Sequence, residues 1–181
     1  MTPASDVLVE PDDGSAGPLL RIADDRLAPG TGYGRHPHRA VDVVAVVLAG
    51  SLRHAWGARP VLRAGDVAVL RAGTGLEHDE VAGDDGAHVL QTYLRSARPA
   101  GPATHEVHRA PAGWVPLHRP DARLWTAAVP AGATAAVPPG LLVLAGPDGT
   151  RVRRQDGGEV LGPATVLVWQ LDATRPAWAD A

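Results

Sequence analysis

Short apolar runs alternate with glycine- and proline-rich turns along the first half of the chain. Residues 41–48 form an almost continuous apolar, β-branched run, which is typical of a strand buried on both faces. A turn at 49–50 and a returning hairpin partner over 52–56 are predicted to follow. The same pattern predicts further strands at 19–22, 67–70, 78–81 and 87–94, with turns at 63–66 and 83–86. About six strands at this spacing favour an antiparallel sandwich or barrel.

A change in composition separates this half from the rest of the chain. Residues 97–113 are rich in proline, glycine and alanine, which predicts a linker. Short strands of the same kind are predicted beyond it, at 124–129, 141–144, 150–152 and 165–171. We therefore expect an all-β chain with an N-terminal domain over residues 1–110 and a smaller C-terminal domain over residues 111–181.

Composition narrows the chemistry that these domains can carry. The 181 residues have a formal net charge of -3, so there is no electrostatic footprint for nucleic acid or an anionic membrane. No cysteine is present, which excludes disulfides, thiolate metal sites and cysteine nucleophiles. The first residues lack the features of a signal peptide and no apolar run approaches membrane-spanning length. We expect a cytoplasmic protein in which imidazole and carboxylate groups would have to hold any metal ion.

Two pairs of candidate ligands stand at the spacing of residues on one face of a strand. Side chains alternate along a strand, so His36 and His38 can point at one ion, and His78 and Glu80 can do the same. Alternation turns the two acids that flank His78 the other way. Three imidazoles and one carboxylate leave open positions on a six-coordinate ion, as in non-haem iron oxygenases. Each pair alone is a weak signal, because two solvated histidines in a loop would look the same.

A longer pattern surrounds both pairs. It consists of residues 29–39, which contain His-Pro-His, and of residues 65–67 and 72–80, with Gly50 and the Leu-Gln pair at 90–91 fitting as well. Over about residues 21–94 the chain resembles the pirin family of the cupin superfamily. The resemblance implies a bicupin, with an intact N-terminal cupin β-barrel and a reduced C-terminal one. By position, it also implies metal ligands at His36, His38, His78 and Glu80.

The same resemblance suggests what the protein does. Pirins bind a metal that is often iron, so we expect Fe(II), with manganese, nickel, copper or zinc as alternatives. Some members are described as quercetin 2,3-dioxygenases, which open the flavonol ring with dioxygen and release carbon monoxide. We expect a dioxygenase of this kind for a flavonol or a similar enol, in which Glu80 is both a ligand and the catalytic base. The alternatives are a metal-binding redox sensor that acts through a protein partner, and a structural ion. Either a monomer or a homodimer is compatible with this pattern.

Three departures from the family pattern bear on the substrate. Asp42 stands where members carry Glu, Tyr93 stands in place of the usual Trp, and the short Ala-Trp-Gly hairpin at 55–57 replaces a longer charged one. A changed hairpin could line the mouth of the pocket. These differences leave the four candidate ligands in place.

The remaining candidates are interpreted as structural. The His-Glu-Val-His run at 105–108 resembles a metalloprotease motif, but its i, i+3 spacing among prolines favours a solvated linker. His54 is expected to form a hydrogen bond within the predicted hairpin. His88 and His118 are expected to be structural or on the surface. In the absence of any Phe, four C-terminal tryptophans are expected to supply core or inter-domain contacts: Trp114, Trp125, Trp169 and Trp178.

Overall fold

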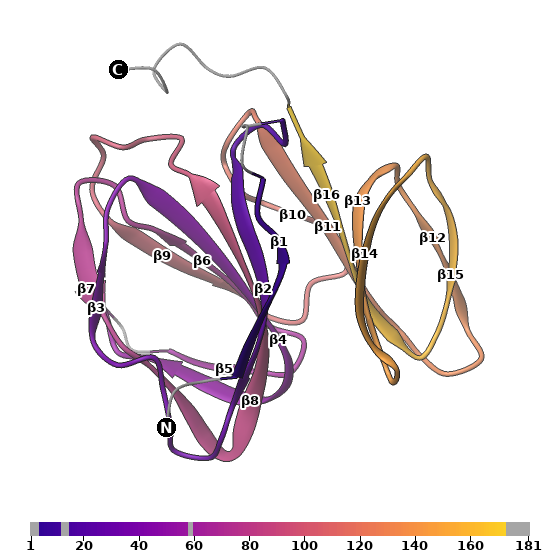
Figure 1. Ribbon diagram of the computed structural model, residues 1–181, viewed down its shortest axis with the longest axis horizontal. Coiled ribbons are helices and arrows are strands. Elements are labelled where there is room, and N and C mark those ends of the chain that lie inside the picture. Colours follow the sequence, from indigo (N-terminus) through magenta and orange to yellow (C-terminus); the bar gives the residue numbers. More distant parts are fainter. Residues whose placement is uncertain (1–3, 12–14, 58–59, 173–181) are drawn as a thin grey trace. The chain divides into compact units, whose positions relative to one another are not determined.

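The computed structural model describes residues 4–11, 15–57 and 60–172, and every regular element within these ranges is a β-strand (Figure 1). The expectation of an all-β chain is therefore confirmed. Two compact units can be distinguished. The first comprises the described residues among 1–11 and 19–110, and the second those among 12–18 and 111–181. No helix in the described part of the chain could cross a membrane.

One large sheet and one small sheet make up the first unit. Its strands are β1 (Ala4–Val9), β2 (Leu19–Leu27), β3 (His36–His38), β4 (Val41–His54), β5 (Val61–Arg63), β6 (Val67–Arg71), β7 (Leu76–His78), β8 (Glu80–Arg95) and β9 (Thr104–His108). The large sheet has the order β1-β2-β8-β4-β6-β9, with β5 also paired to β4, and all its pairs are antiparallel. Strands β3 and β7 pair separately, and Figure 1 shows them side by side at one end of the unit.

The two longest strands are bent where turns were predicted. Residues 49–50 and 83–86 do not reverse the chain but lie inside β4 and β8, so both turn predictions and the hairpin over 52–56 are wrong. Gly50 is paired with Ala87, next to irregularities in the register. A Cβ atom on Gly50, where φ is 70°, would lie 2.1 Å from the carbonyl oxygen of Gly86. Facing bulges thus bend the paired strands, and glycine permits this as readily as it permits a turn.

The core of the first unit follows from the apolar runs. In β4, residues 43–47 are all buried, so the prediction of a strand buried on both faces is confirmed. Alternate residues of β4 and β8 face one hydrophobic cluster, which contains Leu27, Ala45, Val47, Leu52, Leu62, Ala68, Ala82, Ala87 and Val89. Tyr33 and Val107 pack against its margin.

The predicted linker over 97–113 is only partly a linker. Residues 104–108 form β9, which pairs with β6 from Thr104 opposite Arg71 to His108 opposite Val67. Interpretation of the His-Glu-Val-His run as solvated linker is therefore wrong. The order of apolar and polar residues over 104–108 does not predict a strand. Strand β9 lies at the sheet edge, and its hydrogen bonds are made with β6, which is far away in the sequence.

The turn at 63–66 is confirmed, and Asp66 holds it closed. The buried carboxylate of Asp66 accepts hydrogen bonds from the backbone N–H groups of Arg63 and Ala110, at 2.9 and 3.2 Å, and from the Arg109 guanidinium. It therefore ties the start of β6 to the chain that follows β9.

Replacing Asp66 with alanine is expected to destabilise the first unit by about 2–3 kcal/mol, because two backbone N–H groups and the Arg109 guanidinium lose a buried, charged acceptor. Equilibrium urea unfolding, followed by circular dichroism, measures the loss. Asp84→Ala is the control, because this carboxylate is exposed and its removal should cost less than about 0.5 kcal/mol. Equal stabilities of the two variants would contradict the role given to Asp66.

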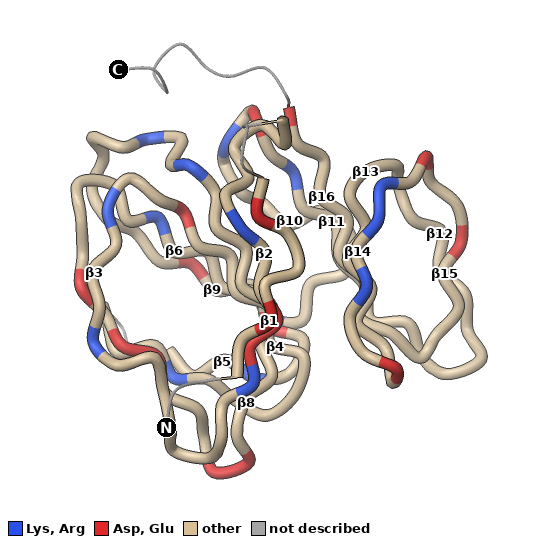
Figure 2. Tube along the Cα trace, in the orientation of Figure 1, with Lys and Arg blue, Asp and Glu red and all other residues tan. Residues whose placement is uncertain are grey.

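A second pair of sheets forms the second unit. Its strands are β10 (Gly113–Val115), β11 (Ala122–Val129), β12 (Thr134–Val137), β13 (Gly140–Gly146), β14 (Gly149–Gln155), β15 (Gly158–Leu161) and β16 (Ala164–Leu171). Five of them form a sheet in the order β10-β11-β16-β13-β14, and β12 pairs with β15. Basic residues lie along the edge strand β14 (Figure 2), where charge discourages pairing with another sheet edge.

The tryptophans of this unit occupy three different environments. Trp169 is 1% exposed and Trp125 packs against the hydrophobic cluster, as predicted. Trp114 is 42% exposed, so it does not supply a core contact. The Arg123 guanidinium lies 3.9 Å from the centroid of its ring. Trp178 lies outside the described residues.

Candidate metal centre

Strand pairing brings the three predicted histidines together. In the β3–β7 pair, His36 lies directly opposite His78. Ring centroids are 4.7 Å apart for His36 and His38, 4.7 Å for His36 and His78, and 4.9 Å for His38 and His78. One ring nitrogen from each lies within 4.8 Å of the other two. The i, i+2 spacing thus places both members of the first pair beside the second strand.

The hydrogen bond of His36 leaves one of its nitrogens free to act as a ligand. Its Nδ1 lies 2.7 Å from the carbonyl oxygen of Gly34, which can only accept, so Nδ1 carries the proton. The Nε2 atom of the neutral ring is then unprotonated, and it lies 3.0 Å from Nε2 of His38. A backbone carbonyl that fixes the tautomer in this way is a usual companion of a metal-binding histidine.

Glu80 belongs to a second group that shares His78 with the first. Its carboxylate is 2% exposed and lies within 4.8 Å of ligand atoms of His54 and His78. Nε2 of His54 lies 2.6 Å from Oε1 of Glu80, and the Gln91 amide donates a hydrogen bond of 3.0 Å to Oε2. Gln91 accepts in turn from the hydroxyl of Tyr93, at 2.6 Å. The Gln91 amide therefore holds one carboxylate oxygen of Glu80 by a hydrogen bond, and the His54 ring lies in close polar contact with the other.

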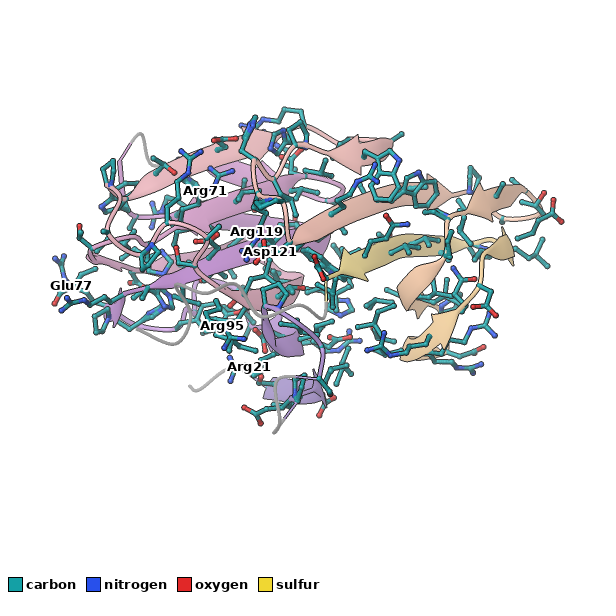
Figure 3. The ribbon with its side chains drawn as sticks, turned by 90° about the horizontal axis from the view of Figure 1, so that it is seen from above. Arg21, Arg71, Glu77, Arg95, Arg119 and Asp121 are labelled. Carbon is teal, nitrogen blue, oxygen red and sulfur yellow. The ribbon has the colours of Figure 1, made fainter. Side chains whose placement is uncertain are left out.

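The acids that flank His78 point elsewhere, as alternation predicts. Glu77 lies at the periphery of the molecule (Figure 3), where its carboxylate is 2.8 Å from the Arg35 guanidinium. Asp79 accepts a hydrogen bond from the backbone N–H of Glu80. Neither acid belongs to the two groups of ligand atoms found in the described residues.

Electrostatics give these groups the protonation states that a metal ion requires. Burial alone would raise the pKa of Glu80, but the His54 and His78 rings and the Gln91 amide lower it to about 2. Burial lowers the pKa of His78 to about 4, assisted by the neighbouring histidines and opposed by Glu80. Burial and His36 also lower the pKa of His38. At neutral pH Glu80 is therefore a carboxylate and His38 and His78 are uncharged imidazoles, the forms that bind metal ions.

Several buried polar atoms of the cluster fit a metal ion. Within the described residues, the side-chain nitrogens of His54 and His78 and Oε1 of Glu80 are buried and have no hydrogen bond of good geometry. Buried polar atoms are normally hydrogen-bonded, so such a group needs an explanation. A set of imidazole nitrogens and one carboxylate suits a first-row divalent ion.

Sequence reasoning missed His54, which is not a hairpin residue. Residue 54 lies directly opposite Glu80 in the β4–β8 register, and its ring stacks on that of His105, with centroids 4.7 Å apart and planes 15° apart. Burial, followed by the charge of His54, lowers the pKa of His105 to about 4. Both contacts depend on pairings that no local pattern reveals. His88 pairs with Asp24 at 2.6 Å and His118 is exposed, in agreement with their interpretation.

Two tyrosines flank the cluster. The ring of Tyr33 lies 6.3 Å from that of His36, and its hydroxyl donates a hydrogen bond of 2.8 Å to Asp25. The ring of Tyr93 lies 6.0 Å from that of His38. Burial raises the pKa of both phenols, to about 12 for Tyr93, so they remain protonated at neutral pH.

Antiparallel sheets that bring together a cluster of histidines and a glutamate are typical of the cupin class. The pirin family model matches residues 9–94. A Mycobacterium tuberculosis protein, provisionally named a quercetin 2,3-dioxygenase, is 30% identical in an alignment of 204 residues that covers 91% of this chain and 84% of that protein. The chain therefore belongs to the pirin family of the cupin superfamily.

Two further comparisons agree with this assignment. A Zymomonas mobilis protein with the same provisional name is 41% identical over 73 residues, which are 39% of this chain and 31% of that protein. The solved structure of the bacterial pirin YhhW from Escherichia coli, in complex with nickel(II), superposes with a TM-score of 0.69 at 18% identity. That superposition covers 93% of this chain and 91% of YhhW, and it confirms the predicted cupin fold.

Proposed function

We propose that this protein is a metal-dependent dioxygenase that opens the ring of quercetin or a similar enol. The observation that carries the proposal is a group of three neighbouring imidazoles adjoining a buried, ionised Glu80. In this proposal His36, His38, His78 and Glu80 hold one divalent ion, Fe(II) in the first instance. The names of the mycobacterial and Zymomonas relatives support the same class of substrate.

The exposure of the four residues supports access from one side. His78 and Glu80 are 1% and 2% exposed, whereas His36 and His38 are only partly buried. A small molecule would therefore approach past the β3 histidines. A divalent ion bound here would supply Lewis acidity toward the enol oxygen and, if redox-active, electron transfer with dioxygen.

The side chains of this protein would orient the substrate and move its proton. Glu80 is ionised at neutral pH, so its carboxylate would be the group that takes the proton of the enol hydroxyl. Gln91 donates to Oε2 and keeps the carboxylate from turning away. The protonated phenols of Tyr33 and Tyr93 add no charge beside the cluster, which suits an aromatic substrate.

Metal analysis followed by a turnover assay tests the proposal. The purified protein is analysed for metals, stripped, loaded anaerobically with Fe(II), and given quercetin in air while absorbance and carbon monoxide are recorded. We expect about one ion per chain, loss of quercetin, and release of carbon monoxide in equal amount. Parallel loading with manganese, nickel, copper and zinc identifies the ion that supports turnover.

Either of two results would contradict the proposed function. If the protein holds an ion but leaves quercetin untouched with every metal, the named activity is wrong and the metal-binding regulatory alternative replaces it. If it holds no ion under any condition, both the activity and the four-residue site are wrong.

A further inference from the structure

We propose that His54 is a positioning residue that, held by the stacked ring of His105, fixes the carboxylate of Glu80 toward the metal ion. The inference rests on the proposed metal centre. It adds two residues behind the four proposed ligands, His54 of β4 and His105 of β9. The sequence pattern predicted a hairpin at the first and a linker at the second.

The first observation is the way the Glu80 carboxylate is held. Nε2 of His54 lies 2.6 Å from Oε1, and the Gln91 amide binds Oε2 at 3.0 Å. The His54 and Glu80 side chains are 3% and 2% exposed, so water does not compete for these contacts. Because the two residues face each other across the β4–β8 pair, the backbone itself sets their separation. A carboxylate with a hydrogen bond to one oxygen and a ring nitrogen packed against the other has little freedom to rotate away from an ion.

The second observation is the way the His54 ring is held. On one side the ring of His105 stacks on it, nearly parallel, at 4.7 Å. The ring of His78 meets it at 77°, with centroids 5.9 Å apart. His105 is carried by β9, where its backbone pairs with Leu70 of β6. The imidazole of His54 is therefore packed between two other rings, which fixes the direction of its Nε2.

A role behind the ligands agrees better with these contacts than a structural role does. Residues that orient a ligand typically change metal affinity by about 10–100-fold when they are removed, without changing the ligand set. Nε2 of His54 lies against the oxygen of a proposed ligand and not against a residue remote from the cluster, which places His54 where it can orient that ligand. The competing possibility is that His54 is itself a ligand, since it forms a group with His78 and Glu80.

Calorimetric titration of the metal-free protein with Ni(II) tests the proposal, because nickel avoids oxidation during the measurement. His54→Ala removes the ring, and His54→Gln replaces it with an amide whose N–H can still donate a hydrogen bond to Glu80. His105→Ala and His105→Phe remove or retain a ring that can stack. His108→Ala, on the same strand but three residues further on, is the control. Circular dichroism and thermal unfolding of the metal-free variants show whether each one folds.

We expect His54→Ala to weaken Ni(II) binding by about 10–100-fold at unchanged stoichiometry, and His54→Gln to recover part of that loss. His105→Ala should weaken binding by a smaller factor, His105→Phe should bind close to the wild type, and His108→Ala should not differ. Visible spectra of Co(II)-loaded wild type and His54→Gln should agree, because the ligand set is the same.

Three results would overturn the inference in distinguishable ways. Equal Ni(II) affinity of the wild type and both His54 variants would remove the positioning role and leave the metal centre standing. A changed Co(II) spectrum in His54→Gln, or complete loss of the bound ion in folded His54→Ala, would make His54 a ligand. Failure of the wild type to bind any ion would overturn the metal centre and this inference together.

Discussion

Replacement of His78 with alanine is expected to abolish metal binding. His78 is the one residue that both groups of ligand atoms share, and it lies opposite His36 in the β3–β7 pair. Its ring is 1% exposed and its pKa is about 4, so it is an uncharged donor at neutral pH. Removing a residue that only orients a ligand weakens metal binding by about 10–100-fold. Removing a proposed ligand such as His78 should weaken it by more than about a hundredfold. Calorimetric titration with Ni(II) measures it.

A matched control for this variant is His88→Ala. His88 is a partly buried histidine of the first unit, but its ring lies against Asp24 and belongs to neither group of ligand atoms. We expect it to bind Ni(II) as the wild type does. Circular dichroism of the metal-free His78→Ala protein checks that the β-structure is retained. Wild-type affinity in folded His78→Ala would show that the ion is held elsewhere.

In the proposed dioxygenase reaction, replacement of Glu80 with glutamine is expected to lower the turnover of quercetin by about 10²–10⁴-fold at saturating metal. The amide has nearly the shape of the carboxylate and can still meet His54 and Gln91, so the protein should fold. It carries no charge and cannot accept a proton as the ionised carboxylate does. The measurement is the rate of quercetin loss in the variant loaded with the ion that supports wild-type activity.

Glu77→Gln makes the same chemical change three positions earlier. The Glu77 side chain is 56% exposed and pairs with Arg35 at the surface, so its loss should leave turnover unchanged. If Glu80→Gln retained the wild-type rate while holding the ion, Glu80 would be neither base nor essential ligand. If it lost the ion instead, its role would be that of a ligand, and the assay would have to be repeated at higher metal concentration.

The parts of this site that sequence reasoning located are those whose geometry is local. The i, i+2 spacing within the His-Pro-His segment is enough to place His36 and His38 on one face, and the same alternation separates Glu80 from Glu77. The all-β class follows from short apolar runs between turn residues. The buried run of β4 follows from its lack of polar positions.

What the sequence could not indicate depends on pairing between distant segments. His54 meets Glu80 only because β4 continues through Gly50, and a glycine that allows a bulge cannot be distinguished locally from one that allows a turn. His105 reaches His54 through the pairing of β9 with β6, although β9 has an edge-strand pattern among prolines. The exposure of Trp114 could not be predicted either, because burial of a large side chain depends on which other residues pack over it.

The position of β8 has a consequence for how the first unit folds. Strand β8 lies between β2 and β4, so the β1–β2 hairpin and the β4–β6 pair have no hydrogen bonds to each other until β8 joins them (Figure 1). Its partners in the chain precede it by tens of residues, and pairing over such separations is slow compared with the formation of helices or hairpins. Glu80 is the first residue of this strand. The step that closes the sheet is therefore also the step that brings Glu80 against His54. An ion that binds the complete cluster would stabilise only those chains in which β8 has paired with β4.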